Sequence, residues 1–250
     1  MDFNLQSRVA LVTGGANGVG REIARTLAAE GAAVAVNYHS SADAAKEVVG
    51  AIEQAGGRAI AYRADVSNLQ AVQEMVAKIV ADLGSLDILV NNAGVAERKR
   101  FTDTNPDDWQ RQIGSCLYGA LHCCHSAMPH LAKSGHGRII GLIGDSSRVG
   151  ESGLSIVAAA RAGVIGLTKS LAREMGKSGL TANVISLGLV ETGHGQEFLD
   201  QNREKLLKFY PVKRLGNADD VPPMVALLAS DRGSWITGQT ISISGGFSMV

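Results

Sequence analysis

The sequence has 250 residues, of which 45% are hydrophobic and 19% charged, and its 24 basic residues balance its 24 acidic ones. A chain of this length and composition can bury a large core, so residues 1–250 are expected to form one α/β domain. The even charge balance gives no electrostatic footprint for nucleic acid or a membrane surface, and neither is expected as a partner.

The sequence carries no recognisable targeting signal. Residues 1–8 lack the basic start and apolar run of a signal peptide, and no apolar run is expected to reach the length of a membrane span. Cys116, Cys123 and Cys124 have no metal-ligand spacing, and a disulfide between the last two, neighbours in an expected helix, would be strained. We therefore expect a cytoplasmic protein with reduced thiols and no metal.

Short apolar runs alternate with stretches of helical periodicity along the whole chain. The expected strands are residues 9–13, 34–38, 59–64, 86–91, 138–143, 182–187 and 240–244. The expected helices are residues 21–30, 42–55, 69–83, 109–131, 157–175 and 218–229, with a loop and helix before Pro211. Continuous apolar strands separated by amphipathic helices predict a parallel sheet covered on both faces.

A glycine-rich turn links the first strand to the first helix. Gly14, Gly18 and Gly20 let the backbone turn tightly and approach a pyrophosphate, which the amides and dipole at the helix start favour. A turn that is merely tight is the alternative. Small or polar residues also end other expected strands, at the edge where open α/β sheets bind ligands. These are Asp65 and Val66, residues 91–94, and Thr192, with Asp65 suited to an adenine amino group.

Taken together, residues 13–20, 65–66, 91–94, 162–174, 183–186 and 238–246 resemble the short-chain dehydrogenase/reductase family over essentially the whole chain. The resemblance implies a Rossmann-type, doubly wound parallel sheet of seven strands in the order 3-2-1-4-5-6-7, with helices on both faces. It also implies dimers and tetramers, homomeric or with a homologous subunit, built through helices 109–131 and 157–175. A nicotinamide cofactor would contact Gly14, Asn17, Gly18, Val19, Asn37, Asp65, Val66, Asn92, Ala93, Gly94, Arg161 and Thr192.

The choice between NADP and NAD depends on the end of the second strand. Asn37 stands where a carboxylate would select NAD by binding the ribose hydroxyls. Without that carboxylate a 2′-phosphate is not repelled, which favours NADP, although the sequence places no arginine there to hold it. A solvated loop over residues 37–41, with no cofactor role, is the alternative, and dinucleotide binding could also be lost.

The family's reaction uses a tyrosine, a lysine four residues later, a serine thirteen residues before the tyrosine, and an asparagine in the preceding long helix. Aligned on residues 158–166, these positions hold Val157, Arg161, Gly144 and Cys116. Val157 has no proton to give, and general acid catalysis typically contributes about 10²- to 10⁴-fold. Arg161 keeps a charge, but its pKa is too high for a proton relay. No catalytic residue is therefore expected at these four positions.

Other residues could supply the catalytic groups that these four positions lack. Asp145, Ser146 and Ser147 follow Gly144, and a shift of two residues would bring a hydroxyl into the site. Only Tyr118 and Tyr210 among the tyrosines are expected near the crevice, where the alternative is that they simply pack. The histidines at 122, 125 and 130 are interpreted as polar contacts on a helix and not as metal ligands.

The residues and the resemblance are consistent with three functions. The first is a non-catalytic structural or regulatory subunit that assembles with an active NAD(P)-dependent hydroxyacyl-type dehydrogenase. It would dock through the small residues Val157, Ala158, Ala159, Ala160, Ala162 and Gly163. Residues 148–153 resemble hydroxyacyl-CoA dehydrogenases of aromatic acid degradation, including the benzylsuccinate type. The second is an NAD(P)-dependent oxidoreductase of 3-oxoacyl reductase or alcohol dehydrogenase type with a relocated proton donor, and the third is a dinucleotide-binding sensor.

Overall fold

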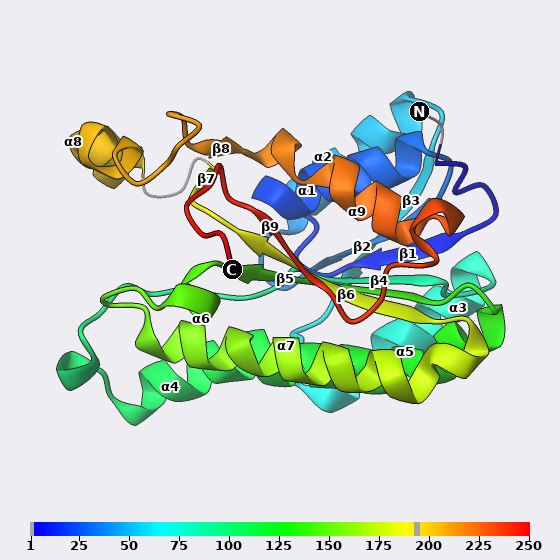
Figure 1. Cartoon of the computed structure of the whole chain (residues 1–250). Coiled ribbons are helices and arrows are strands. Elements are labelled where there is room, and N and C mark those ends of the chain that lie inside the picture. The colour runs from blue at the N-terminus through cyan, green and yellow to red at the C-terminus, as the bar shows by residue number, and fades with distance from the viewer. Residues whose placement is uncertain (1–2, 193–195) are drawn as a thin grey trace.

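The computed structural model describes residues 3–192 and 196–250 (Figure 1). Its main sheet has seven parallel strands in the order β3-β2-β1-β4-β5-β6-β9, which confirms the predicted Rossmann-type topology with β9 as the seventh strand. The strands are β1 (Val9–Val12), β2 (Ala33–Tyr38), β3 (Arg58–Arg63), β4 (Ile88–Asn91), β5 (Arg138–Gly144), β6 (Thr181–Leu187) and β9 (Thr240–Ile243).

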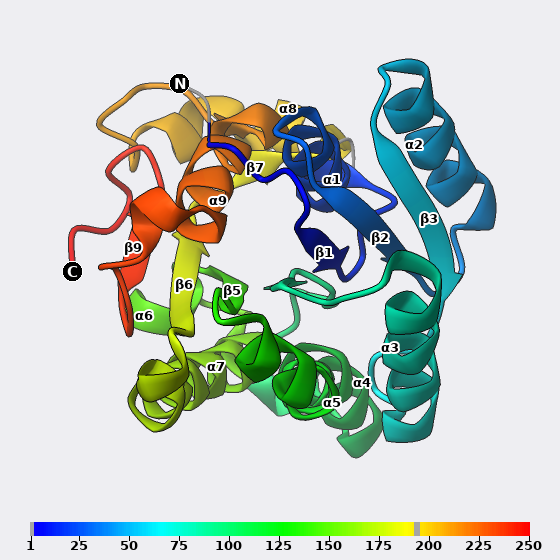
Figure 2. The same cartoon turned by 90° about the vertical axis from the view of Figure 1, so that its right-hand side faces the viewer.

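Helices cover both faces of this sheet, and Figure 2 shows the strands between the two helix layers. One layer contains α1 (Gly18–Ala29), α2 (Ala42–Gln54) and α9 (Pro222–Ala229). The other contains α3 (Leu69–Leu83), α4 (Pro106–Ile113), α5 (Gly119–Ser134) and α7 (Ser155–Met175). At the carboxyl ends of the strands lie α6 (Ser146–Val149), α8 (Gln196–Leu207), and a two-stranded sheet of β7 (Val190–Glu191) and β8 (Gly216–Asn217).

Each face of the sheet has its own apolar core. Val12, Val36 and Ile140 point toward α1, α2 and α9, whereas Leu11 and Leu89 point toward α3 and α5. This alternation follows from the two-residue period of a strand, and burial on both faces explains why the strands read as unbroken apolar runs. Polar loops lie at the carboxyl edge of the sheet, outside the two apolar cores.

The helix expected over residues 109–131 is interrupted. A π-helical turn, Gly114–Tyr118, separates α4 from α5, and Cys116 lies in it. The first part begins earlier than expected, because Asn105 and Asp108 form a capping box around Pro106. A π-turn of five residues is itself helical and has no sequence signature of its own, so the sequence pattern predicted one continuous helix.

The expectation that no segment reaches the length of a membrane span needs a correction. Within the described part of the chain, the segment Ser155–Ser178, α7 with its following turn, is long and apolar enough by composition to cross a membrane. It packs against β5 and β6 beside α5 and forms part of a helix layer. Only 28% of this apolar stretch is buried, so much of it faces outward.

Candidate functional site

The glycine turn forms a cradle that larger residues could not make. Gly14 and Gly18 have φ angles of +61° and +51°, a region that residues with a Cβ rarely adopt. A Cβ on Gly20 would lie 2.4 Å from the Gly14 carbonyl oxygen. Asn17 precedes α1 without capping it through its side chain, so the first amides of that helix remain available to an anion.

Two asparagines brace this turn from inside. Asn37 is 2% exposed, accepts a hydrogen bond from the Gly14 amide, and donates to the main-chain oxygens of Tyr62 in β3, at 3.3 Å, and of Ala64 just after it, at 3.1 Å. Asn92 donates to the carbonyl oxygens of Thr13 and Gly14. The amide group of Asn37 is thus satisfied by main-chain partners, and its contact with a cofactor stays a prediction.

A groove of about 440 Å³ runs along the carboxyl edge from the glycine turn. It is lined by predicted cofactor residues, namely Gly14, Asn17, Gly18, Val19, Asn92, Ala93, Gly94, Arg161 and Thr192. Thr192 lies close over Gly18. A pocket of this size, with small residues at its base, suits an extended ligand such as a dinucleotide.

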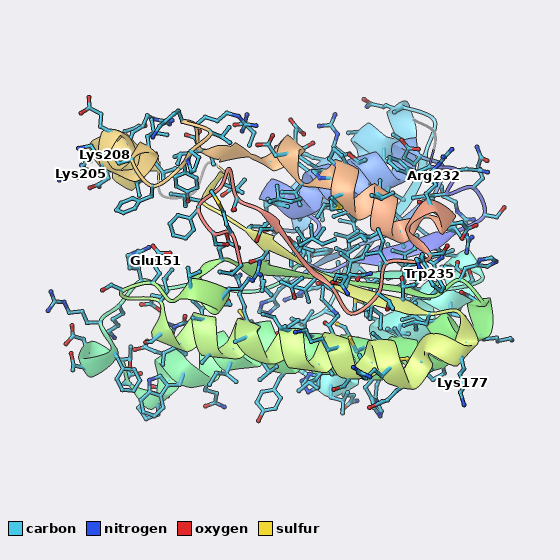
Figure 3. All side chains as sticks on the ribbon, viewed as in Figure 1. Glu151, Lys177, Lys205, Lys208, Arg232 and Trp235 are labelled. Carbon is cyan, nitrogen blue, oxygen red and sulfur yellow. The ribbon has the colours of Figure 1, made fainter. Side chains whose placement is uncertain are left out.

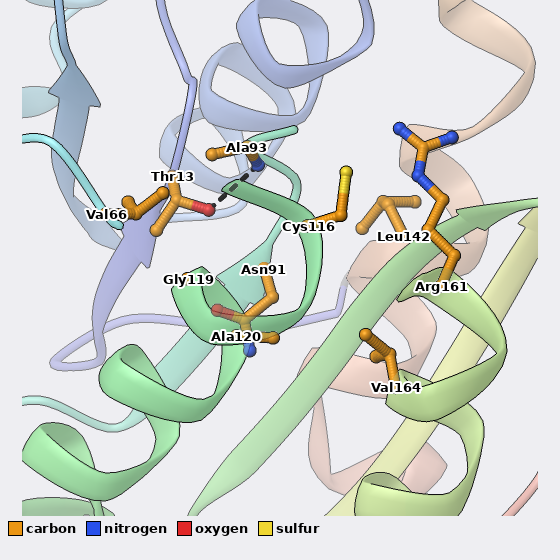
Figure 4. A pocket seen from close by; sticks show the side chains of 10 residues that line it. All are labelled: Thr13, Val66, Asn91, Ala93, Cys116, Gly119, Ala120, Leu142, Arg161 and Val164. Atoms are coloured by element: carbon orange, nitrogen blue, oxygen red, sulfur yellow. Dashed lines mark hydrogen bonds between the residues drawn. The ribbon is translucent and has the colours of Figure 1, made fainter. Parts of the chain in front are cut away.

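The predicted contacts Asp65 and Val66 lie outside that groove lining. Val66 is buried against the smaller cavity of Figure 4, where Thr13 accepts a hydrogen bond from the Ala93 amide. Burial raises the pKa of Asp65, but the hydrogen bonds from the Ser67 amide and hydroxyl outweigh it, and the pKa is lowered overall. Asp65 is therefore a carboxylate at neutral pH and lies 3.9 Å from His39.

An arginine that the sequence analysis missed lies beside the end of β2, on the neighbouring strand. Arg63 ends β3, is paired in register with Tyr38, and donates from Nε to the carbonyl oxygen of His39 at 3.3 Å. Its exposed guanidinium thus stands at the strand end where the sequence offered no cation for a 2′-phosphate. The pairing of β2 with β3 was the missing information, because Arg63 is remote from this point in sequence.

The four positions at which no catalytic residue was expected have two kinds of surroundings. Val157 is 1% exposed and packs with Cys116 and Ala160 in a small apolar cluster, away from the groove. Gly144 and Arg161 line the groove itself. In Figure 4 the side chains of Arg161 and Cys116 extend in the same direction, on either side of Leu142. The cation therefore remains in the crevice, while Val157 has become part of the core.

Beside Gly144, three neighbouring side chains have different surroundings. Asp145 is buried and accepts hydrogen bonds from Ser186 of β6 and from Ser248 near the C-terminus, the latter at 2.6 Å. The Ser147 hydroxyl is buried without a partner among the described residues. Of the three, Ser146 turns toward Gly144, since its Oγ lies 3.3 Å from where a Cβ on Gly144 would be.

A second cavity, of about 560 Å³, adjoins the groove. The two share Ala96, Gly144, Arg161, Leu187, Gly188 and Val190. The rest of its wall is mostly apolar, with Leu154, Leu189, Leu199, Leu206, Phe209 and Phe247. Figure 3 shows Glu151 beside α6 on one side, and Lys205 in α8 and Lys208 just after it on the other. The groove along the carboxyl edge thus opens into a mostly apolar cavity.

Of the two candidate tyrosines, only Tyr210 reaches this cavity. Tyr118 is 53% exposed and stacks on His122 on the outer surface of the helices. Tyr210 is 4% exposed, lines the cavity, stacks on Phe247, and accepts a hydrogen bond from the Leu189 amide at 2.9 Å. Burial raises the pKa of Tyr210, partly offset by the Leu189 amide, so the phenol keeps its proton.

Within residues 3–192 and 196–250, no three histidine, cysteine or acidic side chains are grouped as metal ligands. His122 instead contacts the carbonyl oxygen of Val66 through Nδ1 at 2.9 Å. Burial raises the pKa of Cys124 to about 12, so this thiol is not ionised at neutral pH.

Comparison with known proteins gives consistent matches. The family described as Enoyl-(Acyl carrier protein) reductase matches residues 14–248. A 3-oxoacyl-(acyl carrier protein) reductase FabG of Staphylococcus epidermidis is 38% identical over 243 residues, which are 97% of this chain and 100% of that protein. A 3-oxoacyl-(acyl carrier protein) reductase of Synechocystis is 36% identical over 246 residues, covering 98% of both chains.

Two solved structures are also similar over nearly the whole chain. A dehydrogenase/reductase from Sinorhizobium meliloti is similar with a TM-score of 0.92 and 35% identity, covering 99% of this chain and 98% of its own. A blue fluorescent protein from a metagenomic library, solved in complex with NADPH, is similar with a TM-score of 0.91 and 32% identity. That match covers 98% of this chain and 100% of the other.

Proposed function

Because the chain belongs to the short-chain dehydrogenase/reductase family, we propose that it is an NAD(P)-dependent oxidoreductase acting on a carbonyl or hydroxyl compound with an apolar body. One observation carries this proposal: the glycine-lined groove opens into the apolar cavity at Gly144, Arg161 and Gly188. The relatives named as 3-oxoacyl reductases support this function better than the non-catalytic subunit that the sequence favoured.

The residues of the groove fit a nicotinamide dinucleotide. The left-handed Gly14 and Gly18, and the absence of a side chain on Gly20, leave space for a pyrophosphate at the start of α1. The exposed Arg63 supports NADP, because a guanidinium at the end of β2 can bind a 2′-phosphate. The relative solved with NADPH is consistent with that choice.

Tyr210 is the best candidate for the relocated proton donor. A bound nicotinamide supplies a hydride to a carbonyl carbon, and the carbonyl oxygen then requires one proton. Tyr210 lines the cavity as a neutral phenol, and the Leu189 amide at 2.9 Å would stabilise the phenolate left after proton transfer. Since burial makes this phenol a weaker acid, we expect slow turnover.

The test measures binding and turnover separately. Calorimetric titration with NADPH and NADH should show binding, and reduction of acetoacetyl-CoA should be followed by NADPH absorbance. Tyr210→Phe should keep cofactor binding and lower kcat by about 10²-fold or more, whereas the matched change Tyr118→Phe, on the exposed outer surface, should leave both unchanged. Flat titrations with both dinucleotides would remove the function, and a fully active Tyr210→Phe would remove the role of the phenol.

A second function, support of an active homologous subunit, is favoured by a specific observation. The buried Val157 leaves the family's tyrosine position without a hydroxyl, while the outer face of α7 presents the small residues Ala159, Ala162 and Gly166. Val157 and Ala160, which the sequence placed on the docking face, point inward instead. Co-purification with the nearest homologous chain of the same organism, compared with the chain alone, tests this: activity that appears only in the mixture supports it.

A further inference from the structure

Arg161 is an unpaired cation at the junction of the groove and the apolar cavity. A Cβ on Gly144 would lie 3.5 Å from its Nη1, and a Cβ on Gly94 would lie 3.4 Å from its Nη2. Both sides of the guanidinium therefore face glycines. Across the residues that the structure places, no acidic side chain pairs with it. A half-buried guanidinium without a counterion among the described residues favours an anionic ligand.

A second donor faces the same space. The Ser146 Oγ is 3.3 Å from the position that a Cβ on Gly144 would occupy, and it makes no hydrogen bond to another described residue. The absence of a side chain at Gly144 thus opens a space bordered by a hydroxyl and a guanidinium. An oxygen resting on the Gly144 backbone there would be within reach of both donors.

The other charges in the cavity wall are already satisfied. Arg98 pairs with Glu151 and also donates to the Ser152 carbonyl oxygen. Asp145 accepts hydrogen bonds from Ser186 and Ser248. Arg161 is therefore the one charged side chain of this lining left free among the described residues. It lies where the groove meets the cavity, whose remaining surface is mainly leucine and phenylalanine.

We propose that Arg161 and Ser146 bind the carboxylate of an organic acid whose apolar body fills the cavity. A single guanidinium with one hydroxyl matches a carboxylate, and the apolar wall matches a hydrocarbon or aromatic body. Identifying this acid as the substrate, and hence the substrate class as free oxo or hydroxy acids, rests on the proposed oxidoreductase function. The carboxylate site itself rests only on the cavity.

The test compares hexanoate with hexanamide, which has the same shape but no charge, by calorimetric titration of the full chain. Hexanoate should bind more tightly, and Arg161→Gln should weaken it about tenfold or more, as expected for a lost charged hydrogen bond. Ser146→Ala should weaken it about threefold. Arg173→Gln, the same charge change on the exposed face of α7 about 18 Å along the helix, should have no effect.

Gly144→Ala provides a variant that leaves the charge in place. Its methyl group should occupy the space between the two donors and weaken hexanoate binding. Thermal unfolding should stay nearly unchanged, because the two nearest atoms are ends of side chains and the Leu187 carbonyl oxygen is 4.0 Å away. Equal binding of hexanoate and hexanamide, or binding insensitive to Arg161→Gln, would overturn the proposal.

A further titration separates this proposal from the oxidoreductase function. Hexanoate should still bind when NADPH is saturating; if NADPH abolishes that binding, Arg161 serves the dinucleotide and the carboxylate site is wrong. Hexanoate binding that depends on Arg161, in a chain that binds neither NADPH nor NADH, would retain the carboxylate site and remove the oxidoreductase.

Discussion

Two glycines in neighbouring helices differ in what surrounds them. Gly20 lies in the first turn of α1, where a Cβ would come within 2.4 Å of the Gly14 oxygen and 2.5 Å of the Asn92 amide nitrogen. Gly50 lies in α2 with no atom within 4 Å of its Cβ position. The first glycine is required by close packing of the turn, whereas the second only lowers the stability of its helix.

Gly20→Ala should therefore destabilise the protein by about 1–3 kcal/mol through overpacking, and should also weaken NADPH binding by disturbing the turn. Gly50→Ala, as the matched control, should stabilise it by about 0.5–1 kcal/mol. Urea unfolding followed by circular dichroism measures both. Equal effects of the two substitutions would show that the turn is not closely packed.

Arg63 allows a test of cofactor selectivity. If its guanidinium binds the 2′-phosphate, Arg63→Gln should raise the Kd for NADPH about tenfold or more and leave that for NADH unchanged. Arg58→Gln, at the opposite end of β3, serves as the control for charge on the same strand. Parallel titrations with both dinucleotides provide the measurement, and equal weakening of NADPH and NADH would contradict the role of Arg63.

Among single residues, the sequence predicted the groove better than the apolar cavity. The glycines, Asn92 and Thr192 were predicted because their positions at strand ends are visible in the sequence. The inward orientation of the Asn37 amide was not predicted, because it depends on main-chain oxygens of Tyr62 in β3 and of Ala64 just after it. The orientation of Ser146 toward Gly144, and of Asp145 away from it, depends on the short helix α6, which the sequence analysis did not predict.

At the scale of elements, the start of α9 is held by a charged cluster. Asp220 accepts two hydrogen bonds from Arg214, at 2.6 and 2.7 Å, and one from the Asn217 amide. The bonds from Arg214 hold the pKa of Asp220 below its usual value despite partial burial. A lowered folded-state pKa stabilises the fold above the unfolded pKa of about 3.9, and this contribution is lost as pH falls through the folded value.

Asp220→Asn should consequently lower the melting temperature at neutral pH by about 1–3 °C, since the pair is partly exposed. The difference from the unaltered chain should shrink as pH falls below about 4. Thermal unfolding by circular dichroism at several pH values measures it. A difference that stays constant down to low pH would mean that the carboxylate charge is not the cause.

The elements were predictable to different degrees. All seven strands of the main sheet were expected, because each is a continuous apolar run between helical stretches. The split of the long helix at Gly114 was not, since a helical turn of only five residues cannot be distinguished in the sequence from the α-helices on either side. The pair of two-residue strands, β7 and β8, was also missed, because so short a bridge depends on contact between distant loops.

For the whole molecule, we propose that another copy or a homologous chain would dock on the outward face of α7. Ala159, Ala162 and Gly166 lie exposed along it, and no atom is found within 4 Å of a Cβ on Gly166. Small residues at this spacing let two helices approach closely. In the isolated fold, a large side chain at position 166 should meet no obstacle.

Gly166→Arg should therefore leave the subunit folded but break an assembly formed through α7. Light scattering after size exclusion should show a smaller mass than for the unaltered chain, and circular dichroism an unchanged spectrum. Gly176→Arg, after the end of the same helix and equally free of neighbours within 4 Å, is the control. An unchanged mass for Gly166→Arg would exclude this face as the interface.

The burial of all three cysteines makes the chain convenient for spectroscopy. Cys116, Cys123 and Cys124 are at most 5% exposed, and burial raises the thiol pKa of both Cys123 and Cys124. Maleimide reagents should thus spare the native thiols in the folded state. A cysteine introduced at Trp235, which is 97% exposed, should take up a single fluorophore or spin label without removal of any native cysteine.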